Sequence, residues 1–409
     1  MTDFNSDFMR TLSERGYLHQ ATEARALDAH CVLQIMPGYI GFDATAPSLH
    51  VGNLVQIMML RRLQQTGHRP IVLMGGGTSK IGDPSGKDEV RRMLTAEQIG
   101  DNIASIKRIF ERFLSFDDGE TGAILVDNSE WLDRLGWIEL LREVGHHFTI
   151  NRMLTFDSVK LRLEREQPMT FLEFNYMISQ AYDFMELHRR YGCRVQMGGS
   201  DQWGNIVNGI ELARRADGAA LFGVTTPLIT RSDGQKMGKS VSGAIWLHED
   251  QLPHWDYWQF WRNVDDRDVG RFMKLFTDLP LDEIARFEAL QGIEINAAKI
   301  ALANEATTLA RGAAAAHAAE ETAKQTFGAG GQGGDLPSLK VDTGTISLVD
   351  ALAGFGFVES RGEAKRLIKA GGARVDGEQV RDEAAIVTIG ADPVRISAGK
   401  KVHGVLVRG

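Results

Sequence analysis

The feature that most limits the fold is a repeated order in the first half of the chain: apolar run, helical pattern, glycine-rich turn. The run QIMPGYIGFD predicts a strand, and apolar residues at helical spacing predict a helix over Val51–Gln65. Further apolar runs, Pro70–Met74 and Cys193–Met197, lead into GGG and GGSDQWGN, and a helix then continues to Arg215. This order predicts an α/β fold with a doubly wound parallel sheet. Such sheets bind ligands beyond the carboxyl ends of their strands, where these glycine-rich turns fall.

The chain of 409 residues is long enough for several domains. We expect the sheet domain with a connective insertion in residues 1–230, a helical domain in 231–326, a flexible glycine-rich linker in 327–340 and a small α+β domain in 341–409. In the last of these, Ser360 and Glu363 have capping-box spacing and predict a helix through Lys369. Ala373–Val375 and Gln379–Val380 predict a hairpin after it.

Composition narrows the class of protein. Hydrophobic residues make up 43% and charged residues 24%, as in soluble globular proteins. The two cysteines, Cys31 and Cys193, have no metal-binding spacing and suggest packed thiols in a reducing compartment. The N-terminus lacks the apolar core of a signal peptide, and no run of apolar residues is long enough to span a membrane. We therefore expect a cytoplasmic protein.

The charge distribution gives a weak indication of a nucleic-acid partner. A net charge of −8 argues against phosphate binding by the whole chain. Residues 340–409, however, carry 11 Lys and Arg against 9 Asp and Glu. Five of these cations gather on the predicted helix and hairpin, and they form the candidate RNA-binding set: Arg361, Lys365, Arg366, Lys369 and Arg374.

The segment GFDATAPSLHVGN, from Gly41 to Asn53, suits an anion. It places a strand end, a turn and a helix N-terminus together, where backbone N–H groups and the helix dipole favour negative charge. Thr45 and His50 would add donors, and Gly52 would let a flat ring approach the backbone. On its own, the segment fits equally an ordinary strand–helix corner with a surface histidine.

The segment KMGKS, Lys236–Ser240, carries two ammonium groups three residues apart. Beside Gly238 they would form a cationic loop that neutralises a polyphosphate in a transition state. A solvated basic turn explains the same five residues when they are considered alone.

Considered together, HVGN and KMGKS resemble the HIGH and KMSKS motifs of class I aminoacyl-tRNA synthetases. Asn53 replaces the second histidine of the first motif, and Gly238 replaces the first serine of the second. IGDPSGK (81–87), FNYMISQAYDF (174–184) and GGSDQWGN (198–205) are similar to the bacterial tyrosyl-tRNA synthetase family. The C-terminal part is similar to the RNA-binding fold shared with ribosomal protein S-four, so that the resemblance runs from about Tyr39 to the C-terminus.

The resemblance implies a Rossmann-like catalytic domain that activates tyrosine with ATP and Mg²⁺ and transfers it to tRNA(Tyr). It also implies a homodimer, no tightly bound cofactor and no metal site built by the protein. The tyrosine carboxylate would attack the α-phosphorus of ATP in line, so that no side-chain nucleophile is needed. The residues implied for the leaving pyrophosphate are Thr45, His50, Lys87, Arg91, Lys236 and Lys239. For Lys87 and Arg91, a solvated basic loop after GDPSG fits the sequence equally well.

The implied tyrosine-binding residues are Tyr39, Asp83, Tyr176, Gln180, Asp183 and Gln202. Tyr39 and Asp183 would bind the phenol, which donates one proton and accepts one. Tyr176, Gln180 and Asp183 are spaced at i, i+4 and i+7 and so share a helix face; apolar flanks argue against a merely solvated polar stripe. The implied ATP-binding residues are Gly41, Asp43, His50, Gly52, Asn53, Asp201 and Lys239. Ile40 stands where many relatives have Cys, which removes a ribose contact.

Several alternatives remain open. A tryptophanyl-tRNA synthetase shares the sheet and both phosphate motifs, but Tyr39, Asp183 and the C-terminal part disfavour it. A catalytically silent RNA-binding protein is disfavoured because His50 and both lysines of KMGKS are present. Arg214 and Arg215 resemble residues near the tRNA acceptor stem, yet they also fit cations in the last turn of a helix. Phe171 fits either a dimer interface or the core.

Overall fold

The computed structural model describes residues 3–80, 94–230, 232, 234, 237, 239–240, 243–327, 336–390, 393–399 and 402–408. Six residues named above are therefore outside the described part, wholly or in their side chain: Asp83, Lys87, Arg91, Lys236, Gly238 and the side chain of Lys239. The chain forms two compact units. The first holds Met1–Gly238, Trp246–His248 and Asp265–Ile295, and the second holds Lys239–Ile245, Glu249–Val264 and Asn296–Gly409.

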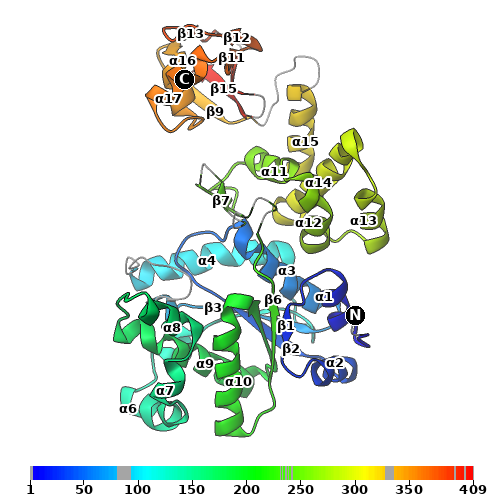
Figure 1. Cartoon of the computed structure of the whole chain (residues 1–409), viewed down its shortest axis with the longest axis vertical. Helices are drawn as coiled ribbons and strands as arrows, with labels where there is room; N and C mark the ends of the chain where they lie inside the picture. The colour runs from blue at the N-terminus through cyan, green and yellow to red at the C-terminus, as the bar shows by residue number, and fades with distance from the viewer. Residues whose placement is uncertain are drawn as a thin grey trace. The chain divides into compact units, whose positions relative to one another are not determined.

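The first unit is built on a six-stranded sheet with the order β1-β6-β5-β2-β3-β4 (Figure 1). Its strands are β1 (Gln20–Ala21), β2 (Pro37–Phe42), β3 (Arg69–Met74), β4 (Ile124–Asp127), β5 (Val195–Gly199) and β6 (Phe222–Thr226). All neighbours pair in parallel except β1, which pairs antiparallel to β6. The predicted doubly wound α/β fold is thus confirmed. The strand order reverses between β2 and β5, which is where such sheets bind their ligands.

Helices cover both faces of this sheet. Alternate residues of a strand face opposite sides. At β2, a methyl group on Gly38 would lie 2.9 Å from Leu63 of α3 (Val51–Gln65), whereas the Tyr39 ring lies 5.2 Å from Phe184 of α9. Helix α3 therefore covers one face, and α9 (Phe171–Tyr191) covers the other beside α10 (Trp203–Asp217).

The remaining helices of the first unit are α1 (Asp7–Glu14), α2 (Ala24–Leu33), α4 (Ala96–Phe113), α5 (Ser129–Leu132), α6 (Trp137–Glu139), α7 (Ile150–Met153), α8 (Asp157–Glu164), α12 (Val269–Phe276) and α13 (Leu281–Glu288). Short α5–α8 form the insertion between β4 and α9, and they pack around Trp131, Val144 and Met153 in the main core. Helices α12 and α13 follow the KMGKS segment in sequence but belong to the same unit as the sheet.

The second unit contains α11 (His254–Arg262), most of α14 (Ile295–Arg311) and α15 (Ala313–Phe327). It begins with a short hairpin of β7 (Lys239–Ser240) and β8 (Gly243–Ala244). Trp255, Trp258 and Trp261 of α11 are buried; α11 packs against the alanine-rich α15, and Trp258 Nε1 donates to Asn304 of α14 over 2.7 Å.

The C-terminal part is small and mixed, as the sequence predicts. Its helices and strands are β9 (Ser338–Val341), β10 (Thr345–Ser347), α16 (Leu348–Gly354), α17 (Arg361–Lys369), β11 (Ala373–Val375), β12 (Glu378–Val380), β13 (Ile386–Thr388), β14 (Val394–Ala398) and β15 (Val402–Arg408). The five-stranded sheet has the order β12-β11-β14-β15-β9, and the predicted hairpin is its β11–β12 pair. The Ser360 hydroxyl caps α17 by accepting from Glu363 N–H. None of the described helices is long and apolar enough to cross a membrane.

Candidate active site

Buried polar side chains gather at the point where the strand order reverses, and this cluster of Tyr39, Asp183 and their neighbours is called the slot below. Tyr39 of β2 is 1% exposed, and its hydroxyl finds no hydrogen-bond partner among the described residues. Burial, followed by the nearby charge of Asp183, raises the pKa of Tyr39 well above its ordinary value. Asp183 of α9 is 2% exposed, and burial raises the pKa of its carboxyl to about 7. The structure thus brings together the two groups that the resemblance implies for a phenol.

Two further side chains, which no sequence motif marks, hold the Asp183 carboxylate. Asn128 donates from Nδ2 to one carboxylate oxygen over 2.9 Å, and Trp131 donates from Nε1 to the other over 2.7 Å. Both follow β4, in the DNSEW stretch after the apolar run ILV. Because the two donors fix both oxygens, the carboxylate keeps one orientation inside the slot.

Asn128 also fixes the glycine-rich turn that follows β3. Its Oδ1 accepts from Gly77 N–H over 2.8 Å, and its Nδ2 donates to Thr78 Oγ over 3.0 Å. The neighbouring Asp127 accepts from Gly76 N–H over 3.0 Å. The turn and the carboxylate are therefore positioned by the same amide group.

Three glutamines, Gln180, Gln196 and Gln202, lie on α9, on β5 and just after β5. Gln180 Nε2 donates to Gln202 Oε1 over 3.4 Å, so two of the expected tyrosine-binding residues are neighbours. Gln180 Oε1 and Gln196 Oε1 are buried without a hydrogen-bond partner in the described part of the chain. Gln196, the β5 residue in register with Tyr39, was missed by the sequence argument because a lone glutamine in an apolar run carries no motif. Tyr176 is 7% exposed on the same helix as Gln180. Buried polar atoms in proteins are usually hydrogen-bonded, so these two oxygens need a partner, and a polar ligand is one candidate.

The HVGN segment forms the N-terminus of α3. His50 is the N-cap; its Nδ1 accepts from Gly52 N–H over 3.0 Å, and Asn53 Oδ1 accepts from His50 N–H over 3.3 Å. A Cβ at Gly52 would lie 2.7 Å from the His50 ring and 3.0 Å from the Met237 carbonyl oxygen. Glycine is therefore required by the packing of the chain itself, a reason additional to the expected approach of a nucleotide ring.

The other expected ATP residues lie around the same strand ends. Gly41 and Thr45 are exposed, Asp43 is half-buried, and Asp201 is exposed in the 3-10 turn after β5. Asp201 accepts from Gln202 Nε2 over 3.3 Å. Ile40, which stands at the Cys position of relatives, is 3% exposed within β2.

The structure also places the residues for which two interpretations were open. Arg214 and Arg215 both pair with Glu211, at 3.1 and 3.4 Å, and Arg215 donates to the His147 carbonyl. Phe171 is 68% exposed, so it does not belong to the core. Cys31 and Cys193 are buried thiols, and burial raises the pKa of Cys31 to about 12.

The five cations of the expected RNA-binding set are exposed on α17 and β11. Helix α17 buries Ala364 and Ile368 toward the core of the C-terminal part, which turns its basic residues outward. Arg361 is paired with Asp350, and Arg374 donates to the Gly377 carbonyl oxygen over 3.0 Å. This arrangement suits contacts to phosphates.

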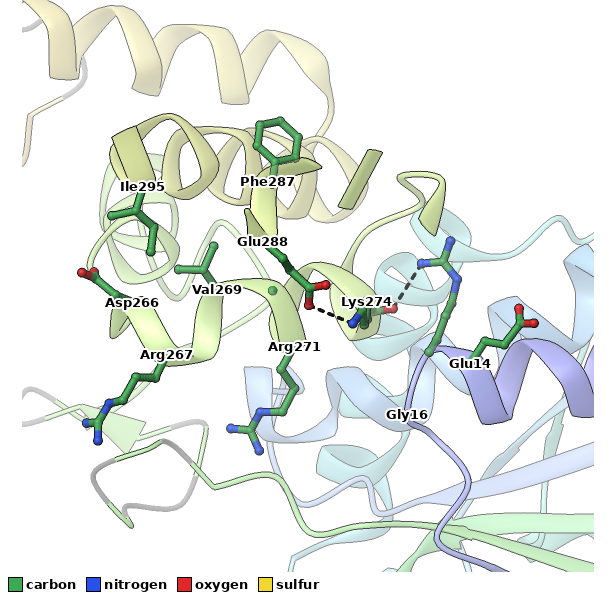
Figure 2. A pocket seen from close by; sticks show the side chains of 12 residues that line it. Glu14, Gly16, Asp266, Arg267, Val269, Arg271, Lys274, Phe287, Glu288 and Ile295 are labelled. Atoms are coloured by element: carbon green, nitrogen blue, oxygen red, sulfur yellow. Dashed lines mark hydrogen bonds and ion pairs between the residues drawn. The ribbon is translucent and has the colours of Figure 1, made fainter. Parts of the chain in front are cut away.

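A separate cleft of about 480 Å³ lies between the N-terminal segment and α12–α13 (Figure 2). Its walls mix cations and acids: Arg271 and Lys274 of α12 face it, and Lys274 pairs with Glu288 of α13 over 2.8 Å. None of the expected tyrosine or ATP residues lines it. The cleft is therefore not the candidate active site.

Comparison with known proteins agrees with this geometry. The profile of the family described as "tRNA synthetases class I (W and Y)" matches residues 36–328, and that of the S4 domain matches residues 348–392. The chain therefore belongs to the class I tRNA synthetase family that comprises the tryptophan and tyrosine enzymes. Within it, the chain is 66% identical to the tyrosine–tRNA ligase of Novosphingobium aromaticivorans, over 99% of both chains. It is 64% identical to that of Zymomonas mobilis over the whole length of both.

Solved structures give the same result. A C-terminally truncated mitochondrial tyrosyl-tRNA synthetase of Aspergillus nidulans superposes with a TM-score of 0.72 at 31% identity, covering 79% of this chain and 95% of its own. A tryptophanyl-tRNA synthetase of Encephalitozoon cuniculi has a TM-score of 0.55 at 11% identity, covering 75% of this chain and 87% of its own, which supports the fold alone.

Proposed function

We propose that the chain is a tyrosine–tRNA ligase that forms tyrosyl-adenylate from tyrosine and ATP and then esterifies tRNA(Tyr). The observation that carries this proposal is the slot itself. A buried carboxylate on α9 and a buried tyrosine hydroxyl on β2 lie near enough for the charge of the first to act on the second, and they suit a phenol that donates one hydrogen bond and accepts another. The high identity to tyrosine–tRNA ligases supports the same substrate.

In the first step, a carboxylate oxygen of tyrosine attacks the α-phosphorus, and the bond from that phosphorus to the pyrophosphate oxygen breaks. In the second, the terminal ribose hydroxyl of the tRNA attacks the tyrosyl carbonyl carbon, and AMP leaves. The substrate supplies the nucleophile in both steps, so the protein contributes positioning and charge stabilisation.

Our proposed positioning follows from the local geometry. His50 Nδ1 accepts from Gly52 N–H, so the proton of the neutral ring is on Nε2, which can donate to a phosphate oxygen. The N-terminus of α3 adds backbone N–H groups and its dipole. Thr45 and the KMGKS lysines, with Lys87 and Arg91, complete the proposed charge stabilisation of the pyrophosphate.

Mg²⁺ fits this site as a companion of the triphosphate. The described residues hold no cluster of three or more potential metal ligands, and Mg²⁺ is commonly held by substrate phosphates with few carboxylates. When bound, the ion neutralises charge on the leaving pyrophosphate. Asp43 and Asp201 follow β2 and β5 in the chain and are the acids that we propose near the nucleotide.

We also propose that the enzyme is a homodimer that acts in the cytoplasm, where ATP and tRNA are available. Large apolar side chains are exposed on the insertion and at the start of α9. Trp137 is 51% and Phe171 is 68% exposed, and their rings lie edge to face at 6.1 Å. Ile138, Leu141 and Leu172, at 65%, 45% and 47% exposure, are their neighbours in sequence. Exposed apolar side chains in such number favour an interface with a second copy.

Pyrophosphate exchange tests the activity directly. The intact chain is given ATP, labelled pyrophosphate and one of three amino acids: tyrosine, phenylalanine or tryptophan. Exchange with tyrosine alone is expected, because a site built to bind a hydroxyl leaves buried polar groups unpaired when that hydroxyl is missing. Exchange with tryptophan would indicate the other branch of the family, and exchange with none would indicate a protein that only binds RNA.

A further inference from the structure

The chain on either side of the KMGKS sequence is fixed to other parts of the first unit. On the far side, Leu247 N–H donates to the Leu49 carbonyl over 2.8 Å, and His248 N–H donates to Ser48 Oγ over 3.0 Å. His50 and Trp246 form a further bridge. The segment that follows KMGKS is thus fixed directly to the residues that begin α3.

On the near side, the attachment is made by helix α12. Asp268 at its N-cap is 3% exposed, and its carboxylate accepts from Ser232 N–H over 2.8 Å. The other carboxylate oxygen accepts from Arg271 Nη2 over 2.8 Å, and the same nitrogen donates to the Thr230 carbonyl over 2.5 Å. Ser232 stands four residues before Lys236 in the chain.

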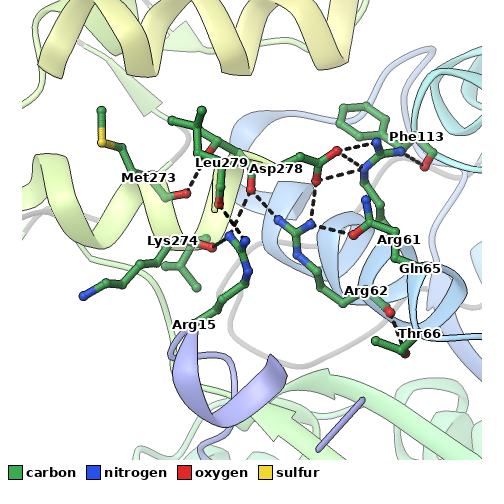
Figure 3. Close-up of polar contacts among 12 residues, drawn as sticks. Arg15, Arg61, Arg62, Gln65, Thr66, Phe113, Met273, Lys274, Asp278 and Leu279 are labelled. Atoms are coloured by element: carbon green, nitrogen blue, oxygen red, sulfur yellow. Dashed lines mark hydrogen bonds and ion pairs between the residues drawn. The ribbon is translucent and has the colours of Figure 1, made fainter. Parts of the chain in front are cut away.

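The other end of α12 is fixed to α3 by a charged cluster (Figure 3). Arg61 and Arg62 both donate to the Asp278 carboxylate, the second over 2.5 Å from Nη1. Arg62 Nη2 donates to the carbonyl oxygen of Thr277, the C-cap of α12, over 2.5 Å. Arg15 donates to the carbonyl oxygens of Lys274, Thr277 and Leu279 over 2.7 to 3.2 Å.

Helix α12 has the properties of a rigid connection. It has eight residues and so spans about 12 Å. Phe272, Met273 and Phe276 are buried, and Lys274 pairs with Glu288 of α13 on the side that Figure 2 shows. A shift of α3 relative to Thr230 and Ser232 would therefore have to break ionic hydrogen bonds at one end of α12.

We propose that α12 is a positioning element for adenylate formation, with Asp268 and Asp278 as its positioning residues. Through Asp278 it holds the helix that begins at His50, and through Asp268 it holds the backbone from which the KMGKS sequence continues. Neither carboxylate needs to touch a substrate. The inference rests on the proposed function, since it concerns how the two ATP-binding motifs keep their spacing.

The test uses the full chain and the variants Asp268→Asn, Asp278→Asn and the double variant. The matched control is Asp282→Asn, which removes an exposed carboxylate that pairs with Arg286 in α13, next to the cluster. For each protein, tyrosine-dependent pyrophosphate exchange gives kcat and the KM for ATP, and equilibrium dialysis gives the Kd for tyrosine.

Each single variant is expected to lower kcat/KM for ATP about two- to thirty-fold while the Kd for tyrosine stays within about twofold. The double variant is expected to have about the same kcat/KM for ATP as the less active of the two single variants, because both substitutions release the same connection. The control should match the unaltered enzyme.

Three results would overturn the proposal: unchanged ATP kinetics in both single variants, losses that multiply in the double variant, or an equal loss of tyrosine affinity, which indicates general loosening. If Asp278→Asn does not bind tyrosine, Asp268→Asn and Arg271→Leu decide the question from the other end of α12. Exchange by the unaltered enzyme is measured first: its absence refutes the proposed function, whereas exchange that the variants leave unchanged refutes the role of α12 alone.

Discussion

The substitution Asp183→Asn tests how the buried carboxyl of Asp183 contributes to the stability of the first unit. The amide has the shape of the carboxylate but no charge, so it removes the penalty for burying an ion. It also presents an NH₂ group to one of the two donors, Asn128 or Trp131. Asn128 cannot flip its amide to accept from the new NH₂ group, because its own Oδ1 already accepts from Gly77 N–H. The variant therefore loses one hydrogen bond, which costs about 1–3 kcal/mol.

The pH dependence of the unfolding free energy is expected to show a larger effect than the lost hydrogen bond. Burial raises the pKa of Asp183 from 3.8 to about 7, so between these values the native state holds a proton that the unfolded chain has released. The free energy of unfolding must therefore fall as pH rises through this range and level off above it. At about 1.36 kcal/mol per pH unit, this one group removes about 3 kcal/mol between about pH 5 and about pH 8. An asparagine at this position does not titrate, so the variant loses no unfolding free energy from this site over the same pH range.

Urea unfolding at these two pH values measures the effect. The transition of the first unit is identified as the one that saturating tyrosine shifts in the unaltered protein. Between the lower and the higher pH, the unaltered protein should lose about 3 kcal/mol of unfolding free energy that the variant keeps. Asp282→Asn, on an exposed helix face, serves as the control. Parallel pH profiles of variant and unaltered protein would refute a buried, proton-holding Asp183.

Three further outcomes are expected. His50→Ala should slow tyrosine-dependent pyrophosphate exchange about a hundredfold or more with little change in tyrosine affinity, since a transition-state donor is lost; an unchanged rate would remove His50 from the mechanism. Deletion of the residues after Ser338 should preserve exchange and abolish charging of tRNA(Tyr), because the basic face of α17 is lost; charging that survives would show that the C-terminal part is not needed. Phe171→Glu should convert a dimer into a monomer in light scattering, whereas an unchanged mass would exclude this surface as the interface.

The sequence predicted those parts of the fold in which local pattern and tertiary structure agree. Helix α3 begins and ends at the predicted residues, because a histidine–asparagine cap precedes a run of apolar residues at helical spacing. The β11–β12 hairpin was equally readable, since Asp376 and Gly377 both adopt positive φ, at 48° and 89°, as a tight two-residue turn requires. The order of apolar runs and glycine-rich turns was enough to predict the parallel sheet.

Only part of the candidate site could be predicted from the sequence. Tyr39, Gln180 and Asp183 were selected because a family resemblance pointed to them, and the structure places the first on β2 and the other two on α9, which covers that face of the sheet. Asn128 and Trp131 were not, because their importance depends on a contact with Asp183 more than fifty residues away along the chain. No local pattern separates a polar residue that ends a strand on the surface from one that orients a buried carboxylate.

The cluster at Asp278 shows the same limit for charged residues. Arg61 and Arg62 stand near the end of a helix, where cations are common for local reasons, and Asp278 stands in the loop between α12 and α13. The side chain of Arg62 is nevertheless only 3% exposed, and the hydrogen bonds and charges of the two arginines hold the pKa of Asp278 at about 2 against the opposing effect of burial. A buried cation is tolerated only where a partner compensates it, so the carboxylate and both arginines must be kept or replaced together. That constraint acts across more than two hundred residues of sequence, and it explains why a segment beyond KMGKS folds with the sheet whose helix α3 it contacts.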